Sequence, residues 1–521
     1  MAKRRDELAA YTFARKRTVA AFLAPEPGGS EEGAPRPVRT VMPSLAIGVV
    51  LVIGFIAWGV IKPAAPKGWD TPGEHIIVDS DSTTRYIVLK EGGDKVLHPV
   101  LNYASAKLLL DKGKGTVIEV PAKEIDKSGI RHGSTIGIPY APDRMPAKDD
   151  AETPKTWAVC ERPAKGGKTL DRAVFVLNKE DAEAVNDEGK VSSKEALYVY
   201  EPESKLRFLV DGKGNVFRLG NNEVNADPVQ TRNLLNAVVG GSAEPQPVSA
   251  QWLKTLRDRG PITFPDVPGA GGTTGVQGLP EEATTIGKVL KAEDAQGEGY
   301  FVVLKDEVAA ISPFVAGLLR NSPTAKLAYG TESAEPIEVD ATDITAANGG
   351  EVPEFFNDKG WPQRPPKQAN AVDEATGTVN NTSCSVFDGK ASRSGLGLAA
   401  WAGKAYPKKV IADSLNAYVS SGSGLIFQEV RSATGGGGGW YLLTDTGLRY
   451  SLPSGNDSAA DKDGSKATGS KDGQPSETDK ARTRLGYEKV KRPAIVPRNW
   501  AEFIPKGPML DTGSAAQEQS Q

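Results

Sequence analysis

The sequence predicts an α+β protein. Its main part is a β-rich core with four small repeat modules, preceded by an N-terminal helix and one long apolar helix. Three observations predict this class. Four stretches alternate β-branched or aromatic runs with short Gly or Asp turns, and further strand-like runs flank each of the two cysteines. One long uncharged run lies near the start of the chain.

Length and charge exclude several classes of protein. The chain has 521 residues, which allows three or more folded units and excludes a single small module. Its 63 Lys and Arg against 66 Asp and Glu give a net charge of -3. Because nucleic-acid binding needs a basic patch or a high domain pI, we expect no nucleic-acid partner.

The apolar run covers residues 40–61, 22 residues without a charge. A helix of that length spans about 33 Å, enough for the hydrocarbon core of a bilayer. A cleaved signal peptide is the alternative, but its apolar region is shorter and lies closer to the start. Basic residues before the run place the tail in the cytoplasm and the bulk of the chain outside, although Lys62 and Lys67 weaken this contrast. Ser44 and Gly48 form a small-xxx-small pair that could let a second helix approach.

The segment Arg4–Leu23 predicts an amphipathic basic helix, with Leu8, Tyr11, Val19 and Phe22 near helical spacing. Such a helix could lie on an anionic membrane surface or dock in the groove of a partner. A solvated, passive tail is the alternative. We expect Leu8, Tyr11 and Phe22 to be the partner contacts.

Four stretches outside the apolar run share a strand, a short turn and, in most cases, a following helix. In the first, the sequence predicts a strand at Tyr86–Lys90, a turn at Gly92–Gly93 and a helix at Val100–Leu110 that is entered through His98-Pro99. The stretches are residues 84–111, 206–221 with 229–240, 299–320 and 439–453. Their unequal spacing excludes a regular solenoid, so we interpret them as four copies of one module; chance similarity between β-hairpins is the alternative.

The two cysteines, Cys160 and Cys384, lie in the part assigned to the outside, where thiols can pair. We expect a disulfide; two separate buried thiols are the alternative. The spacing excludes a CxxC redox motif and a cysteine-rich zinc site. Strand-like runs around both cysteines, TWAVCERP and AVFVLN, then SCSVFDG and GLIFQEV, predict that the disulfide joins a separate β-rich core.

A phosphate-binding loop would need the pattern GxxxxGK[ST]. The nearest run is Gly166-Gly167-Lys168-Thr169, but Arg162 stands where the first glycine should be. We interpret this run as a polar surface turn. No GxSxG nucleophile elbow is present.

The remaining chemistry-bearing residues do not form a recognisable catalytic or metal-binding motif. The three histidines are too widely spaced for a local metal motif and are expected to be structural, and two acidic pairs lie in polar, turn-rich sequence and are expected to be solvated. These residues are His75, His98 and His132, and the pairs Glu281-Glu282 and Asp149-Asp150. We therefore predict no catalytic residue, no metal and no cofactor.

The predicted organisation follows from these features and from composition. Residues 269–278 are expected to be a loop, and the Gly-, Ser-, Asp- and Lys-rich residues 454–483 a disordered insertion. The divisions are a cytosolic tail at 1–39, the transmembrane helix at 40–61, repeat modules at 68–125, 196–265, 285–340 and 436–510, core parts at 126–195 and 341–435, and a flexible tail at 511–521.

Several runs together carry a resemblance to a known family. They are RRDELAAYTFARKRTVAAFL, the apolar span, LHPVLNYASAKLLL, STIGIPYAPDRMP, TWAVC, YFVVLKDEVAAISPFVAGLL, YLLTDTGLRYSLP, LGYEKV and VPRNWAEFIPKGPMLD. In this order the runs resemble EccB, the single-span membrane component of actinobacterial type VII (ESX) secretion systems. The resemblance covers roughly residues 1–510; the chain departs from it at 454–483 and after Asp511.

The resemblance implies a cytosolic N-terminal helix, one span of the cell inner membrane and an elongated extracytoplasmic part. That part would have a disulfide-linked core and four repeats similar to a phage-lysin cell-wall-binding subunit. The resemblance also implies the partners EccC, EccD and EccE in one inner-membrane complex, a higher-order oligomer and contact with membrane lipids.

We therefore expect a non-enzymatic assembly component that supports protein export. Two alternatives come from other functional classes. One is an ATP-hydrolysing secretion component, because family members are sometimes labelled ATPases. The other is a cell-wall-binding module, with peptidoglycan as a further partner.

Overall fold

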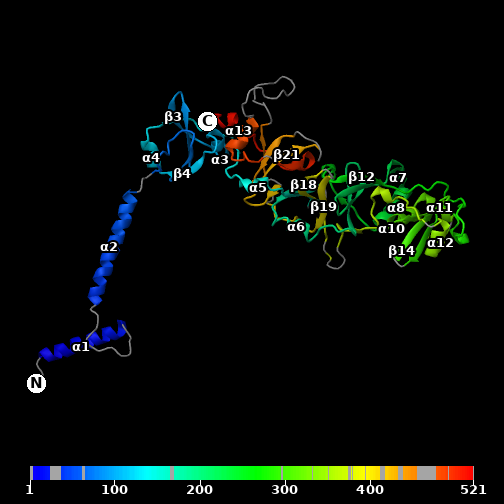
Figure 1. Cartoon of the computed structure of the whole chain (residues 1–521), viewed down its shortest axis with the longest axis horizontal. Coiled ribbons are helices and arrows are strands. Elements are labelled where there is room, and N and C mark those ends of the chain that lie inside the picture. Colours follow the sequence, from blue (N-terminus) through cyan, green and yellow to red (C-terminus); the bar gives the residue numbers. More distant parts are fainter. Residues whose placement is uncertain are drawn as a thin grey trace. The chain divides into compact units, whose positions relative to one another are not determined.

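The computed structural model describes residues 4–23, 37–61, 65–164, 169–294, 297–330, 332–349, 351–372, 377, 379–392, 395–410, 417–431, 438–453, 477–490 and 492–519 (Figure 1). The chain divides into two compact units. The first comprises Met1–Thr71, Ile77–Thr83 and Ile118–Ile130. The second comprises Pro72–Ile76, Thr84–Val117 and Arg131–Gln521.

The first unit contains helices α1 (Arg4–Leu23), α2 (Pro37–Ile61) and α4 (Ala122–Lys127). Helix α1 has the predicted bounds, and it places Asp6 and Glu7 in its first turn, where the helix dipole favours negative charge. Within the described residues, no helix combines the length and the apolar character that crossing a membrane requires.

The face of α1 that carries most of its large apolar side chains is not purely apolar. At about 100° per residue, Leu8, Tyr11 and Phe22 lie within an arc of about 60°. Arg15 projects within the same arc, and Phe13 lies about 140° from Leu8. The amphipathic character of α1 is therefore weaker than predicted. The prediction used the spacing of four apolar residues and did not consider the positions of Phe13 and Arg15.

Strands β1 (His75–Asp79) and β4 (Thr116–Val120) have residues in both units. In the second unit, β2 (Arg85–Glu91) pairs antiparallel with β3 (Asp94–Pro99), and β3 pairs parallel with β5 (Arg131–His132). Gly92 and Gly93 connect β2 to β3 with φ values of 60° and 100°, which favour glycine at both positions.

Helix α3 (Tyr103–Leu109) begins three residues later than the predicted Val100–Leu110. The Asn102 side chain accepts a hydrogen bond from the backbone N–H of Ser105 and caps the helix. His98 and Pro99 end strand β3, so they do not form the predicted helix entry.

The second sheet has the strand order β11-β8-β9-β10-β12, and β17 also pairs with β8. Its strands and the neighbouring helices are β8 (Glu195–Tyr200), β9 (Arg207–Asp211), β10 (Asn215–Leu219), β11 (Gln246–Pro247), β12 (Arg257–Ile262), β17 (Lys367–Gln368), α7 (Asn222–Ala226), α8 (Pro228–Val238) and α9 (Ala250–Leu253). Asp227 caps α8 and Pro228 occupies its first turn, where proline costs no hydrogen bond.

The third sheet has the order β15-β14-β13-β16. Its elements are β13 (Val289–Asp294), β14 (Gly297–Val303), β15 (Val308–Ile311), β16 (Ile337–Glu338), α10 (Pro313–Arg320), α11 (Pro323–Tyr329), α12 (Ala341–Ala347) and the 3-10 turns η1 (Glu281–Ala283) and η2 (Asn357–Lys359). Ser312 caps α10. Residues 269–278, all described, contain neither helix nor strand, as predicted.

The fourth sheet has the order β23-β22-β21-β24. Its elements are β21 (Leu425–Val430), β22 (Trp440–Leu443), β23 (Arg449–Leu452), β24 (Ala494–Pro497), α13 (Glu477–Arg484), α14 (Arg498–Ala501) and α15 (Thr512–Ala515). The run GLIFQEV, predicted as part of the disulfide core, forms β21 here instead, because β22 and β24 supply its hydrogen-bonding partners.

Two predictions near the C-terminus are wrong in part. Of the predicted disordered residues 454–483, residues 454–476 lie outside the described residues, but 477–483 belong to α13, which buries Ala481. The tail after Asp511 is not free: Asp511 caps α15, Ala515 is fully buried, and the Gln519 N–H donates to the Thr135 carbonyl. In both segments a buried alanine, Ala481 or Ala515, packs against the folded part although the surrounding sequence is polar, and Asp511 caps the second helix.

The core sheet has the order β19-β18-β6-β7-β20. It is drawn from two distant parts of the chain: β6 (Thr156–Pro163) and β7 (Leu170–Leu177), then β18 (Thr382–Ser392), β19 (Gly395–Gly403) and β20 (Ala417–Val419), with α5 (Lys148–Glu152) and α6 (Glu183–Asn186) nearby in sequence. One buried cluster joins it to the second and fourth sheets, including Trp157, Val199 and Phe427. A second cluster joins α3 to the fourth sheet.

All four predicted strand–turn–strand stretches contain antiparallel hairpins, β2–β3, β9–β10, β14–β15 and β22–β23. In all four a further strand pairs parallel with the hairpin or with its neighbouring strand, as β5, β12, β16 and β24 do. That the four hairpins are copies of one module stays a prediction.

The packing of α15 can be tested with a matched pair of substitutions. Ala515→Glu buries an unpaired carboxylate, so we expect the free energy of unfolding to fall by about 3 kcal/mol. Ala516→Glu, at the exposed neighbouring position, should change it little. Urea unfolding followed by tryptophan fluorescence measures both; equal effects would contradict the docking of the C-terminus.

Candidate functional site at the disulfide-linked junction

Cys160 and Cys384 form the predicted disulfide, and both are fully buried. They stand directly opposite each other on the antiparallel strands β6 and β18, with Cα atoms 4.0 Å apart. The bond joins residues 224 positions apart in the sequence. In the chain-entropy picture, closing a loop of this length contributes about 5 kcal/mol through the unfolded state.

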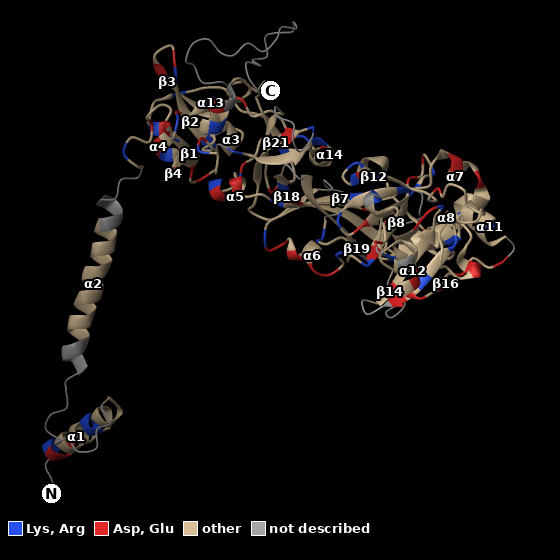
Figure 2. Cartoon of the chain, turned by 45° about the vertical axis from the view of Figure 1, so that its right-hand side comes forward, with Lys and Arg blue, Asp and Glu red and all other residues tan. Residues whose placement is uncertain are grey.

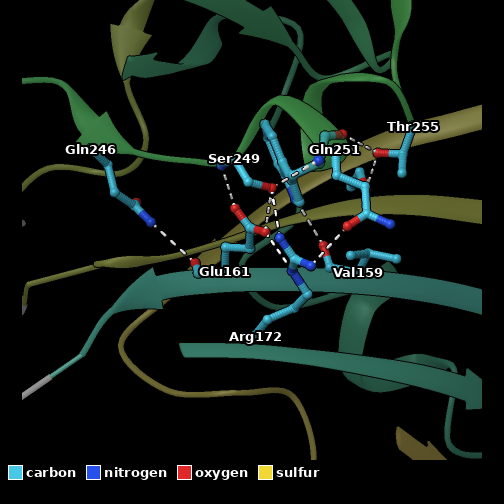
Figure 3. A network of polar contacts seen from close by, with 9 residues as sticks. Val159, Glu161, Arg172, Gln246, Ser249, Gln251 and Thr255 are labelled. Carbon is cyan, nitrogen blue, oxygen red and sulfur yellow. Dashed lines mark hydrogen bonds and ion pairs between the residues drawn. The ribbon is translucent and has the colours of Figure 1, made fainter. Parts of the chain in front are cut away.

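The next residue on β6 is Glu161, whose side chain is fully buried. Its Oε1 lies 2.7 Å from Nε of Arg172 on β7 and accepts a 2.7 Å hydrogen bond from the Ser249 hydroxyl. Its Oε2 accepts the backbone N–H of Ser249, also at 2.7 Å (Figure 3). A buried charge is tolerated only when it is paired and hydrogen-bonded, and Glu161 meets both conditions.

Arg172 extends the network toward helix α9. Its Nη1 donates to Oε1 of Gln251 at 2.9 Å, and its Nη2 donates to the Ser249 hydroxyl at 2.8 Å. The guanidinium also lies over the ring of Phe503, 5.0 Å from its centroid. All three guanidinium nitrogens therefore have a partner, which fixes the orientation of the side chain.

Two amides connect the core sheet to the second sheet. Gln246 donates to the backbone carbonyl of Glu161 at 3.1 Å and accepts from the Ser383 hydroxyl at 2.7 Å. Asn370 bonds both backbone groups of Tyr198 on β8, each at 2.9 Å, and donates to Gln246 at 3.3 Å. Paired amides of this kind fix the spacing of the two sheets.

Helix α9 is held against the core sheet by further polar contacts. The Trp252 indole N–H donates to the Val159 carbonyl at 2.9 Å, while the Thr255 hydroxyl lies 2.6 Å from that of Ser385 (Figure 3). Apart from the Glu161–Arg172 pair, these hydrogen bonds and those of the Glu161 network join residues that lie 77 to 172 positions apart in the sequence. We call this set of contacts the polar junction.

A second polar clamp joins α5 to the fourth sheet. The Asp150 carboxylate lies 2.6 Å from Nζ of the buried Lys155 and accepts from the Ser423 hydroxyl and the Gly424 N–H at 2.9 and 2.8 Å. Burial raises the pKa of Asp150, but the hydrogen bonds from Lys155, Gly424 and Ser423 outweigh it and hold the pKa below its usual value. The prediction that the Asp149-Asp150 pair is merely solvated is therefore wrong for Asp150, because a neighbouring strand turn supplies its donors.

The predicted contact residues of the first unit remain exposed. Leu8, Tyr11 and Phe22 are 68, 69 and 90% exposed on α1. Ser44 and Gly48 lie on α2, where a Cβ added to Gly48 would meet no described atom within 4 Å. The structure brings none of these five residues to a described partner side chain, so their roles stay predictions.

In the part of the chain that the structure describes, the other candidates do not converge on a reactive site. Most of the Gly166–Thr169 run lies outside the described residues. His98 is buried between Glu91, 2.9 Å from its Nε2, and the Ser134 carbonyl, 2.9 Å from its Nδ1. Among the described residues, no group of three or more His, Cys, Asp or Glu side chains is placed to hold a metal ion.

Sequence reasoning found the cysteines but missed the polar junction. The one available signal was the charge of Glu161 within the run TWAVCERP, where alternation would allow either an exposed or a buried carboxylate. Nothing local to Ser249, Gln246 or Asn370 indicates that they meet it.

The fold and this junction define a multi-sheet α+β scaffold that is held together by one disulfide and by the ion pair of the buried Glu161. The sequence profile of the family described as "Type VII secretion system ESX-1, transport TM domain B" matches residues 2–521. The chain belongs to this family.

Curated relatives are similar over part of their length. The chain is 27% identical over 302 residues to the "ESX-1 secretion system ATPase EccB1" of Mycolicibacterium smegmatis (strain MKD8), covering 58% of this chain and 57% of the relative. For the protein of that name from Mycobacterium tuberculosis (strain ATCC 25618 / H37Rv) the identity is 28%, over 54% of this chain and 55% of the relative. The chain thus spans about half the length of these curated relatives.

Solved structures share the fold over almost the whole chain. A chain of an intact ESX-5 inner membrane complex matches with a TM-score of 0.58 at 20% sequence identity. The match covers 100% of this chain and 96% of the ESX-5 chain. A chain of the EccB3 dimer from the ESX-3 core complex matches with a TM-score of 0.57 at 21% sequence identity. This match covers 85% of this chain and 99% of the EccB3 chain.

A single substitution in the polar junction should lower the free energy of unfolding. Glu161→Gln removes the counter-charge of Arg172 and turns a buried amide NH2 toward a donor of Arg172 or Ser249, so we expect a loss of about 2 kcal/mol in the free energy of unfolding. Glu488→Gln, which removes an exposed ion pair with Lys112, should cost under about 1 kcal/mol. Urea denaturation of the two variants checks this; similar midpoints would contradict a structural role for the junction.

Asp150 predicts a pH dependence of stability. The pKa of Asp150 is lower in the folded protein than in the unfolded chain, where it is about 3.9. The ionised carboxylate therefore stabilises the folded state above about pH 3.9, and this contribution is lost as the pH falls through the pKa of the folded state. Asp150→Asn should therefore destabilise the protein at neutral pH, and the difference should shrink below about pH 4. Asp149→Asn, on the exposed side of the same helix, is the control. A deficit that is unchanged in acid would contradict this origin.

Proposed function

We propose that this chain is a non-enzymatic assembly component of a type VII secretion inner-membrane complex, with one membrane span, a cytoplasmic tail and a rigid extracytoplasmic part. The family match over residues 2–521 carries the proposal. Two similar solved chains, one from an ESX-5 inner membrane complex and one from an ESX-3 core complex, support it.

Helix α2 is the proposed span. Its described side chains, residues 41–57, carry no charge and cover about 26 Å, while the whole helix Pro37–Ile61 covers about 37 Å against a hydrocarbon core of about 30 Å (Figure 2). Large apolar side chains from Val41 to Ile56 are each 51 to 75% exposed. Since burying one such side chain is worth about 1.5–3 kcal/mol, water is an unfavourable environment for this helix.

The second unit is proposed to act as a rigid scaffold. Clusters of buried residues connect neighbouring sheets, and the disulfide and the polar junction fix the central ones. An oxidising compartment, where a disulfide persists, suits this part of the chain. The basic residues of α1, with those between α1 and α2, favour a cytoplasmic tail.

Helix α1 is the proposed contact with cytosolic partner domains, among which we propose EccC, EccD and EccE. Its apolar side chains, Phe22 at 90% above all, are far more exposed than a folded surface usually leaves them. A neighbouring domain that buries Leu8, Tyr11 and Phe22 would gain several kcal/mol, at about 1.5–3 kcal/mol each before ordering costs.

Copurification tests the assembly role. Replacing Leu8, Tyr11 and Phe22 together with Ser should leave the chain membrane-inserted, because α2 is unchanged, but lower the recovery of EccC, EccD and EccE with the tagged chain. Replacing Ala9, Ala10 and Ala20 with Ser adds the same number of serines to the opposite face of α1 and should leave recovery unchanged. Equal recovery with all three baits would reject α1 as an assembly contact, and absence of these partners with the unaltered bait would reject the assembly role.

Protease accessibility tests the topology. Protease added to intact protoplasts should digest the region after residue 67 and leave an epitope on the N-terminal tail protected, because the bilayer shields only the cytoplasmic side. The control is detergent lysis, after which both regions should be digested. Protection of the large region in intact protoplasts would overturn the proposed orientation.

ATP hydrolysis is the second candidate, because the names of the curated relatives include the word ATPase. It predicts ATP turnover by the purified chain that Lys168→Ala abolishes. Turnover that survives Lys168→Ala would point to a contaminating enzyme or to another site.

A further inference from the structure

A pocket of about 400 Å³ lies in the second unit, between α3, the loop before α5 and the turn that follows α13. Its lining combines aromatic and apolar surface with cations. The apolar part comes from Tyr103, Met145 and Leu485. The cations are Lys107, Arg144 and Lys148.

Lys107 is the most confined of these cations. Its Nζ donates to the Lys114 carbonyl at 2.9 Å and lies 5.8 Å from the centroid of the Tyr103 ring. Burial lowers the pKa of Lys107, and among the described residues no carboxylate lies within ion-pair distance of it. An ammonium group has three donors, so Lys107 keeps hydrogen-bonding capacity for a ligand.

The other charges of the lining do not neutralise the pocket. Arg144 pairs with Asp445 at 3.4 Å. The one carboxylate of the lining, Asp143, pairs with Arg85 at 3.5 Å and accepts the Tyr103 N–H at 3.0 Å. Lys148 has no ion pair within the part of the chain that the structure describes. Two lysines therefore line the pocket without a protein counter-charge.

We propose that this pocket binds a small ligand through a phosphate or carboxylate group, with Lys107 and Lys148 as its counter-charges and the Tyr103 ring against its carbon skeleton. The arrangement fits because a desolvated ammonium binds an oxyanion through charge-assisted hydrogen bonds, while an aromatic face contacts the uncharged part. This site goes beyond the proposed assembly function and does not depend on it.

Isothermal titration calorimetry on the full chain in a nonionic detergent tests the proposal. The probes are inorganic phosphate, acetate, glycerol 3-phosphate and, as a neutral comparison, glycerol. We expect at least one of the three anions to bind and glycerol not to bind. Tighter binding of glycerol 3-phosphate than of phosphate would identify a phosphate carried on a polyol, as in a lipid headgroup; the reverse order would identify free phosphate.

Substitutions assign the binding to the pocket. Lys107→Met and Lys148→Met should each raise the Kd of the bound anion by about tenfold or more. Lys112→Met removes a nearby positive charge that pairs with Glu488 outside the pocket, and it should leave Kd unchanged. Because Lys107 also bonds the backbone, Lys148→Met keeps the test valid if the first variant misfolds. No binding of any anion, or an equal loss in all three variants, would overturn the proposal.

Discussion

The carboxylate of Glu161 is the point on which the second unit depends. It is fully buried, one residue from the disulfide, and each of its oxygens accepts hydrogen bonds at 2.7 Å from Arg172 or Ser249. A carboxylate in this position is stable only if α9 and β7 are both in place. The hydrogen bonds from Ser249, at the start of α9, therefore make the packing of the core sheet conditional on the packing of α9 and the second sheet. Hydrophobic contact alone would specify this arrangement less strictly.

The same principle recurs at other buried polar contacts of the second unit, with different residues. Asp150 and Lys155 clamp α5 to the turn before β21, and the buried Arg449 pairs with Glu429 at 2.7 Å within the fourth sheet. Apolar clusters fill the space between these polar contacts. Buried pairs of this kind add little net stability over an apolar core, but they penalise alternative packings, which suits a scaffold that must keep its sheets in fixed register.

Helices α1 and α2 differ from the second unit in the exposure of their apolar side chains. The second unit buries its large apolar side chains in shared clusters, whereas α1 and α2 leave theirs exposed. An isolated helix gains little from its own hydrogen bonds, so apolar residues on it have a purpose only where a bilayer or a partner covers them. This contrast underlies the proposed division of labour between a membrane-inserted, partner-contacting part and a rigid outer part.

The sequence by itself determined the local elements and one long-range contact. Glycine turns between β-branched runs specify hairpins such as β2–β3, and Asp227 with Pro228 specifies the start of α8, because these signals act within a few residues. The disulfide was predictable because only two cysteines exist to pair. The family resemblance, carried by short runs along the chain, added as expectations the partners EccC, EccD and EccE and the likeness of the repeats to a cell-wall-binding subunit.

Only the tertiary structure decided which strands share a sheet and which polar residues meet. The run GLIFQEV reads as a strand wherever it is placed, but its neighbours β22 and β24 assign it to the fourth sheet. Asp149 and Asp150 are neighbouring residues of the same type in the same polar run, yet only the Asp150 carboxylate accepts hydrogen bonds from residues 423 and 424. The burial of Glu161 and Ala515 likewise depends on segments that lie far away in sequence, so no local pattern of polarity or propensity carries that information.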